Sequence, residues 1–114
     1  MFRHRRRVMR EKSRRSEALA FLGLARRAGA VVKGTDATRR ALRAGEVRLV
    51  VLARDGSETQ RGKIVPLAAA RGVPWVLLGT MDELGAALGA GPLAATGVTE
   101  RQFAGEIRKR SGRE

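Results

Sequence analysis

A glycine placed between basic and hydroxyl residues marks the segment of this sequence best suited to bind a ligand. The segment reads Lys33-Gly34-Thr35-Asp36-Ala37-Thr38-Arg39-Arg40. It follows a short apolar pair and opens a stretch with helical periodicity, which predicts a strand end, a glycine turn and a helix start. The first N–H groups of a helix lack intrahelical partners, so those of residues 35–38 are expected to form an anion site. Positive charge surrounds this site, contributed by Lys33, Arg39, Arg40 and Arg43.

The net charge of the whole chain favours the same kind of ligand. Its 114 residues include 24 Lys and Arg against 11 Asp and Glu, which gives a formal net charge of +13. A protein this basic attracts polyanions and releases their counterions when it binds them. Nucleic acid, an anionic membrane surface and acidic proteins all fit this charge.

Residue types that the sequence lacks exclude several kinds of chemistry. It contains no cysteine, so disulfides, thiolate metal sites and cysteine nucleophiles are excluded. The single histidine, His4, lies in an arginine-rich stretch with no second metal ligand or defined pocket in sight. We therefore predict no catalytic residues, no metal and no cofactor, in a protein that is not an enzyme.

The two ends of the chain differ in composition from its middle. Residues 1–15 hold eight Lys and Arg and one Glu, and predict a basic arm that is disordered until it meets a partner. The folded domain is expected over residues 16–107, followed by a polar tail over 108–114. The apolar run at residues 18–25 is far shorter than the ~20 residues of a membrane span. Because Arg26 and Arg27 follow where a signal peptide would be cleaved, we expect a cytoplasmic protein that binds no membrane.

Helical and extended segments alternate along the domain. Apolar runs predict four short strands, at residues 31–32, 47–53, 74–78 and 93–98. The helices are expected to start at capping residues, namely Ser16, Thr35, Ser57, Thr80 and Thr99, the last three with the spacing of a capping box. Pro66 is expected to kink or break its helix. The pattern predicts an α/β fold in which helices cover both faces of a four-stranded sheet.

The glycine segment also resembles a known signature. Residues 33–41 read Lys-Gly-Thr-Asp-Ala-Thr-Arg-Arg-Ala, and the signature of the kink-turn-binding ribosomal protein superfamily, archaeal large-subunit type, reads Lys-Gly-Thr-Asn-Glu-x-x-Lys-Ala. Further segments match in the same order, at residues 22–29, Val73-Pro74 and Leu84-Gly85. The match runs from about residue 16 to residue 103, and within the superfamily the chain resembles most closely the bacterial YlxQ-like RNA-binding proteins.

This resemblance implies a three-layer α/β/α sandwich around a four-stranded mixed sheet. It implies that the glycine turn and the helix start bind RNA, and that the loop before the last strand packs against bulged nucleotides. In such a fold, the segment after the second strand lies beside the glycine turn. The candidate RNA-binding residues are therefore Lys33, Gly34, Thr35, Asp36, Ala37, Thr38, Arg39, Arg40, Arg43, Arg54, Gly91, Pro92, Leu93 and Ala94.

Three positions depart from the signature. Asp36 replaces the family Asn, and an ionised carboxylate only accepts hydrogen bonds, whereas an amide also donates them. Ala37 replaces the family Glu and offers no side-chain hydrogen bond. Arg40 replaces the family Lys, keeps its charge and adds a planar fork that suits guanine edges or phosphates.

Three hypotheses follow for function. The first is non-catalytic binding of structured RNA by a monomer, with a ribosomal or translation-associated RNA, a kink-turn-like element and the ribosome as candidate partners. The second is a general electrostatic nucleic-acid binder that depends on the N-terminal arm. The third, an enzyme fragment, draws on RNA methyltransferases that contain such domains, but the sequence carries no cofactor domain.

Overall fold

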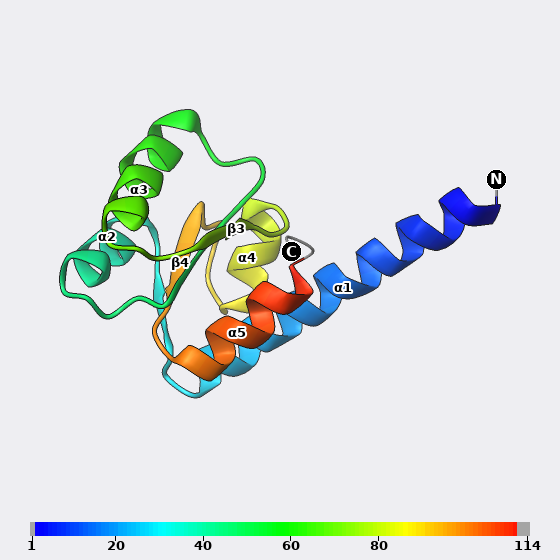
Figure 1. Ribbon diagram of the computed structural model, residues 1–114, viewed down its shortest axis with the longest axis horizontal. Coiled ribbons are helices and arrows are strands. Elements are labelled where there is room, and N and C mark those ends of the chain that lie inside the picture. Colours follow the sequence, from blue (N-terminus) through cyan, green and yellow to red (C-terminus); the bar gives the residue numbers. More distant parts are fainter. Residues whose placement is uncertain (1, 112–114) are drawn as a thin grey trace.

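The computed structural model describes residues 2–111, and the side chains of residue 10 and of residues 12–111. Helices and strands alternate along this part of the chain (Figure 1). The helices are α1 (Phe2–Arg27), α2 (Thr35–Arg43), α3 (Glu58–Ala70), α4 (Met81–Ala87) and α5 (Arg101–Arg110). The strands are β1 (Val31–Lys33), β2 (Leu49–Leu52), β3 (Trp75–Leu77) and β4 (Ala95–Val98). Each predicted strand is therefore present, most of them shorter than the apolar run that predicted it.

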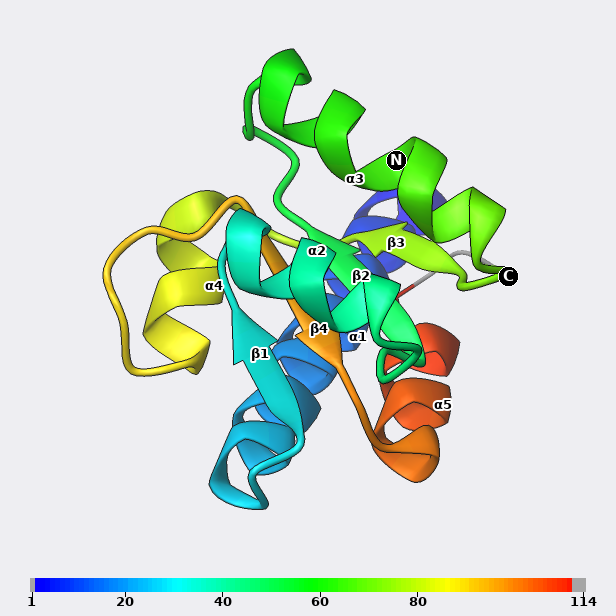
Figure 2. The same cartoon turned by 90° about the vertical axis from the view of Figure 1, so that its left-hand side faces the viewer.

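The four strands form one mixed sheet in the order β1-β4-β2-β3. β4 pairs antiparallel with both β1 and β2, whereas β2 and β3 pair in parallel. As a consequence β1, β2 and β3 all end where β4 begins, which we call the carboxyl end of the sheet. The opposite end, where β1, β2 and β3 begin and β4 ends, is the amino end. Figure 2 shows the start of α2, the segment after β2 and the segment before β4 gathered at the carboxyl end.

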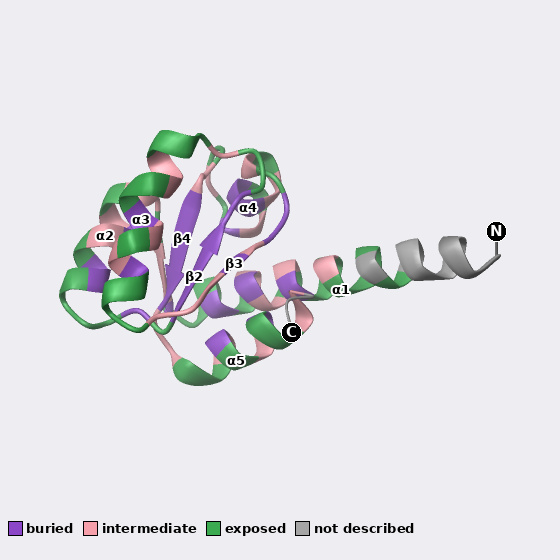
Figure 3. Ribbon diagram, turned by 45° about the horizontal axis from the view of Figure 1, so that its top comes forward, coloured by how far each residue is buried: buried purple, intermediate pink, exposed green. Residues whose placement is uncertain are grey.

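Helices cover both faces of the sheet and form two separate cores (Figure 3). Along β2 the side chains alternate, because Leu49 and Val51 join one core while Val50 and Leu52 join the other. The first core packs against α1, α4 and α5, and the second against α2 and α3. All four β2 residues are buried, as expected for a strand covered on both sides. The predicted α/β/α sandwich is confirmed.

The N-terminal segment differs from its prediction. Residues 1–15 were expected as a disordered arm, but from Phe2 onward they continue α1; residue 1 lies outside the described part. Residues 2–22 contain neither glycine nor proline and are rich in good helix formers, so a helix that packing stabilises at residues 18–25 propagates backward. Ser16 consequently lies inside α1 and does not cap it. Figure 1 shows the first half of α1 extending beyond the body of the domain.

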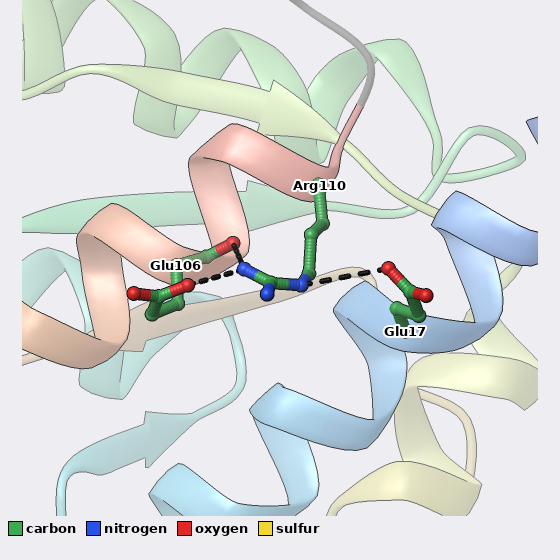
Figure 4. A network of polar contacts seen from close by, with 3 residues as sticks. All are labelled: Glu17, Glu106 and Arg110. Atoms are coloured by element: carbon green, nitrogen blue, oxygen red, sulfur yellow. Dashed lines mark hydrogen bonds and ion pairs between the residues drawn. The ribbon is translucent and has the colours of Figure 1, made fainter.

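The C-terminal boundary also lies later than expected. Residues 108–110 were assigned to a polar tail, but they form the last turn of α5, and residues 112–114 lie outside the described part. Arg110 explains the difference, since it forms ion pairs with Glu106 and, at 3.5 Å, with Glu17 of α1 (Figure 4). Its guanidinium also lies 4.4 Å from the centre of the Phe21 ring. These contacts join the end of α5 to α1.

Two of the predicted helix caps are present. The Ser57 hydroxyl accepts a hydrogen bond from the backbone N–H of Gln60 at 3.1 Å. Thr80 and Glu83 form the complete capping box, in which the Glu83 N–H donates to the Thr80 hydroxyl and the Thr80 N–H donates to the Glu83 carboxylate. In both cases the side chain satisfies a donor at the start of the helix, which is why the sequence pattern was sufficient to find these starts.

Two other predicted caps are wrong, and one helix continues past the residue at which a break was one of the expected outcomes. Thr35 is the first residue of α2, and Gly34 holds the capping position without a side-chain hydrogen bond. Thr99 is still part of the strand pairing, because its N–H donates to the Ala30 carbonyl, and Glu100 caps α5 instead. Pro66 does not break α3, which continues to Ala70.

Candidate nucleic-acid interface

The junction between β1 and α2 is a sharp glycine turn. Gly34 has φ 95° and ψ 163°, a backbone conformation essentially restricted to glycine. Its N–H donates to the Ala95 carbonyl at 2.9 Å, which extends the pairing of β1 with β4 by one residue. Its carbonyl accepts the N–H of Thr38 at 3.0 Å and so closes the first turn of α2. The chain therefore passes from strand to helix within one residue.

This geometry corrects the predicted anion site by one residue. The N–H of Thr38 was expected to be free, but it donates to Gly34. The N–H groups of Thr35, Asp36 and Ala37 precede the first intrahelical bond and remain available at the start of α2. Three backbone donors at a positive helix end still suit a phosphate oxygen.

The start of β4 brings two further segments to the glycine turn. Ala95 pairs on one side with Gly34, while Ala94 accepts the N–H of Ala53, the residue after β2, at 2.9 Å. Neighbouring strands lie ~4.8 Å apart, so the glycine turn, the loop that ends at Ala94 and the Arg54 segment line the same end of the sheet. This arrangement agrees with the sequence-based expectation that Arg54 lies near the turn (Figure 2).

The loop before β4 is held in place by a glycine in α4. A Cβ built on Gly85 would lie 2.1 Å from the Gly91 carbonyl oxygen and 2.9 Å from that of Ala90. The Ala90 N–H donates to the Gly85 carbonyl at 2.8 Å, so the loop lies directly on the helix backbone. Only a residue without a side chain permits this approach, which fixes the path of residues 89–94.

The charged side chains at this end are mostly exposed and unpaired. Lys33, Arg40 and Arg54 are exposed and take part in no ion pair among the described residues. Arg39 is half-buried, and its Nε lacks a hydrogen-bond partner in the described part of the chain. Asp55 differs, because its carboxylate accepts the Met81 N–H at 2.8 Å and serves the start of α4. Lys33, Arg39, Arg40 and Arg54 therefore outnumber the two carboxylates at this end, those of Asp36 and Asp55.

Three predicted site residues are either more buried than the others or farther from the glycine turn. Thr38 is fully buried on the inner side of α2, and its hydroxyl has no hydrogen-bond partner among the described residues. Leu93 is half-buried and packs against the core formed with α1, α4 and α5. Arg43 is exposed at the other end of α2, ~12 Å from Thr35 along the helix. The structure therefore separates Thr38 and Arg43 from the exposed residues around the glycine turn.

The exposed and half-buried candidates at this end of the sheet, without Thr38 and Arg43, are called here the turn surface. It consists of Lys33, Gly34, Thr35, Asp36, Ala37, Arg39, Arg40, Arg54, Gly91, Pro92, Leu93 and Ala94.

One residue at this end was not found by sequence reasoning. Arg61 in α3 donates from Nη2 to the carbonyls of Ala53 and Arg54, at 3.3 and 3.4 Å. It thereby adds a fixed positive charge beside Ala94 and Ala95, with which it lines a small pocket. Its position one turn after the Ser57 cap was a faint signal, because side chains in that turn lie back over the preceding loop.

The fold and this surface define a class of protein, a three-layer α/β/α domain with a glycine turn and a basic helix start at the carboxyl end of its sheet. Residues 16–106 match the model of the Ribosomal protein L7Ae/L30e/S12e/Gadd45 family. Since the match covers most of the chain, the protein belongs to this family, a family of non-enzymatic RNA-binding proteins. The predicted family resemblance is confirmed, and the expectation that the chain is not an enzyme agrees with it.

Individual relatives support the same assignment. Large ribosomal subunit protein eL8 of Halobacterium salinarum is 41% identical over 73 residues, which cover 63% of this chain and 61% of that protein. The chain thus spans about three-fifths of the length of the curated relatives it matches. A solved protein of unknown function from Bacillus halodurans C has a TM-score of 0.79 and 26% identity, covering 82% of this chain and 95% of that one. The 15.5kD RNA binding protein of Giardia lamblia shares the fold, with a TM-score of 0.72, 21% identity, and coverage of 88% and 86%.

The part of the chain that the structure describes shows neither of two other kinds of site. No group of three or more His, Cys, Asp or Glu in that part of the chain is arranged to hold a metal ion. None of its helices is long and apolar enough to cross a membrane.

Proposed function

We propose that this protein binds structured RNA without catalysis, through the turn surface, and that its target is ribosomal or translation-associated RNA with a kink-turn-like element. The observation that carries the proposal is the position of β4 between β1 and β2. Because Ala94 and Ala95 bond to Ala53 and Gly34 respectively, three separate segments form one surface. Family membership and the ribosomal relative from Halobacterium salinarum support RNA as the ligand.

The chemistry of the turn surface supports recognition of RNA shape. Three free N–H groups at the start of α2 are rigidly positioned, and phosphate or base acceptors suit such fixed donors. Arg39 is held by its partial burial, while Arg40 and Lys33 extend into solvent. A kinked RNA that places a backbone turn against this corner would meet all of these donors together, whereas a regular duplex would meet only some of them.

The first half of α1 supports a second candidate function, that of a general electrostatic binder. This extended helix carries most of the eight Lys and Arg of residues 1–15. Such a helix attracts any polyanion, and its contribution depends strongly on salt. In the main proposal it adds contacts to phosphates that are independent of sequence, and in the second candidate it supplies most of the affinity.

A salt-dependent titration with two RNAs tests the proposal. The full chain is titrated against a kink-turn RNA and against a duplex of equal length, from low to high salt. We expect the kink-turn preference to survive at 150 mM salt or above. Arg39→Gln/Arg40→Gln should reduce that preference at least tenfold, since each hydrogen bond to a charged group contributes about 1.5–3 kcal/mol.

A matched variant separates the two candidates. Arg10→Gln/Arg14→Gln removes the same charge from exposed positions of α1, and should lower affinity for both RNAs equally while leaving their ratio unchanged. Equal affinities for the two RNAs that collapse together with salt, and that fall most in the α1 variant, would overturn the main proposal in favour of the second.

A further inference from the structure

A second basic site lies at the amino end of the sheet, away from the turn surface. A pocket of about 220 Å³ opens there between the sheet and α5. Its apolar floor includes Leu49, Pro74 and Ala104. Its charged lining consists of Arg48, Arg101 and Arg108. Residues distant in the sequence therefore form one concave, positively charged site.

The spacing of the α5 residues explains how this pocket forms. Arg101, Ala104 and Arg108 follow the i, i+3, i+7 pattern, which places them on one face of a helix. The two arginines stand ~10 Å apart along α5, at either end of the pocket. Arg48 completes the lining from the segment before β2, and its N–H donates to the Val98 carbonyl at 2.7 Å. The backbones that carry all three arginines are thus fixed by the helix or by the sheet.

None of the three guanidinium groups is paired with a carboxylate among the described residues. All three residues are exposed, and none forms an ion pair or a side-chain hydrogen bond with another described residue. No carboxylate lines the pocket. The acidic residues of α5 and its cap are engaged elsewhere, because Glu106 pairs with Arg110 and Glu100 accepts the Gln102 N–H. A bound anion would supply the missing charge.

Gly105 leaves the floor of the pocket open. It lies in the middle of α5, where glycine destabilises a helix by ~1 kcal/mol relative to alanine. A Cβ at this position would meet no atom within 4 Å, so packing within the protein does not require glycine here. The absence of a side chain lets an incoming group reach the backbone of the helix between the two arginines.

We propose that this arginine pocket binds backbone phosphates of a second RNA segment, while the turn surface holds the first. Guanidinium groups match phosphate oxygens with paired hydrogen bonds, and a single RNA strand offers phosphates at regular intervals to a row of arginines. The proposal extends the proposed function, and it rests on that function for the inference that the ligand is RNA. The protein would then bridge two RNA segments across its sheet.

A two-RNA binding experiment tests this with the full chain. The protein is saturated with an unlabelled kink-turn RNA, and a fluorescent 16-nucleotide RNA of unrelated sequence is then titrated at 150 mM salt. We expect a ternary complex. Arg48→Gln/Arg101→Gln/Arg108→Gln should weaken binding of the second RNA at least tenfold. The slope of the logarithm of its binding constant against the logarithm of the salt concentration should decrease in magnitude by about 2, because each lost single-strand phosphate contact removes ~0.7. Binding of the first RNA should change by less than twofold.

A charge-matched control uses the extended half of α1. Arg10→Gln/Lys12→Gln/Arg14→Gln removes three exposed charges and should weaken the second RNA by less than threefold. Equal losses in the two triple variants would overturn the proposal, as would an unchanged affinity in the pocket variant. Preferential, pocket-dependent binding of a polyglutamate peptide over RNA would also overturn it, in favour of an acidic protein partner.

A second pair of variants tests the shape of the pocket without changing charge. Gly105→Leu should fill the floor and weaken the second RNA several-fold. Gly62→Leu is the matched control, because Gly62 is also an exposed helical glycine with open space around its Cβ position, and it should have no effect. If the kink-turn RNA is not preferred over a duplex, the proposed function fails. The arginine pocket is then tested by direct titration of the 16-nucleotide RNA against the same variants.

Discussion

The two ends of the sheet are both basic, but they present their charge in different ways. At the carboxyl end, backbone N–H groups at the start of α2 and a loop pressed against Gly85 create a surface whose shape is fixed by the main chain. At the amino end, three arginine side chains line an open pocket with an apolar floor. Fixed backbone donors suit recognition of a particular RNA shape, whereas flexible arginines suit phosphates of any sequence. In the proposed function, the protein divides specificity and affinity between these two separate sites.

A larger residue in place of Gly85 should change the difference in RNA binding between the two ends of the sheet most strongly. In Gly85→Ala the new Cβ would lie 2.1 Å from a backbone oxygen, so the loop before β4 must move. We expect destabilisation toward the upper end of roughly 1–3 kcal/mol, as for other overpacked sites. Kink-turn preference should fall, while binding of RNA at the arginine pocket persists. Urea denaturation measures the change in stability, and the two-RNA titration measures the affinity of each site. Equal losses of RNA affinity at the turn surface and at the arginine pocket would contradict independent sites.

Gly34→Ala tests the turn itself. No atom lies within 4 Å of the Cβ position, so the cost comes from the backbone conformation and should be about 2 kcal/mol. Because the strained residue would reorient the start of α2, kink-turn binding should weaken more than binding of a duplex. Thermal unfolding monitored by circular dichroism gives the stability change. An alanine variant with unchanged kink-turn preference would show that the glycine conformation is not needed for recognition.

Restoring the family residues should sharpen the specificity of the carboxyl end. Asp36→Asn/Ala37→Glu supplies the amide and the carboxylate of the signature at the start of α2. Each new hydrogen bond contributes about 0.5–1.5 kcal/mol, so two of them should raise affinity for the kink-turn RNA at least about fivefold. Affinity for the second RNA should not change. A gain for the duplex as large as the gain for the kink-turn would show that the restored side chains do not recognise the kink, since the two substitutions together leave the net charge unchanged.

Thr80→Ala provides the smallest and most local test. It removes the capping box of α4, which should destabilise the protein by about 1 kcal/mol. Both RNA sites should keep their affinities at temperatures where the protein stays folded. Loss of RNA binding without loss of structure would mean that the start of α4 contributes directly to an interface.

The sequence predicted the layers of the fold because local patterns determine them. The continuous burial of β2 and the caps at Ser57 and Thr80 follow from short-range rules. The N-terminal segment was misjudged because its charge indicated disorder, while its helix propensity and the attached packed helix determine the structure. Thr35 was misjudged because Gly34 is the single residue between β1 and α2. Gly34 therefore takes the capping position, and Thr35 is already helical.

The candidate sites could be predicted only where one segment carries them. Most of the charge of the turn surface lies within residues 33–40, so one segment was enough to propose it from the sequence. Arg61 was missed because its hydrogen bonds to the end of β2 are tertiary contacts. The arginine pocket joins residues 48, 74 and 101–108, and no local pattern relates them. The contact of Gly85 with Gly91 likewise depends on the path of a loop.

The length of β4 has a consequence for the kind of RNA that would satisfy both sites. Ala95 and Val98 mark the two ends of this strand, about 10 Å apart at ~3.4 Å per residue. Because the hydrogen-bonded sheet does not stretch, β4 fixes the distance between the turn surface and the arginine pocket. An RNA whose two segments were too far apart would occupy only one site at a time, and would lose the gain in affinity that comes from binding both. Selection by spacing would therefore favour compactly folded RNA over extended RNA of identical sequence.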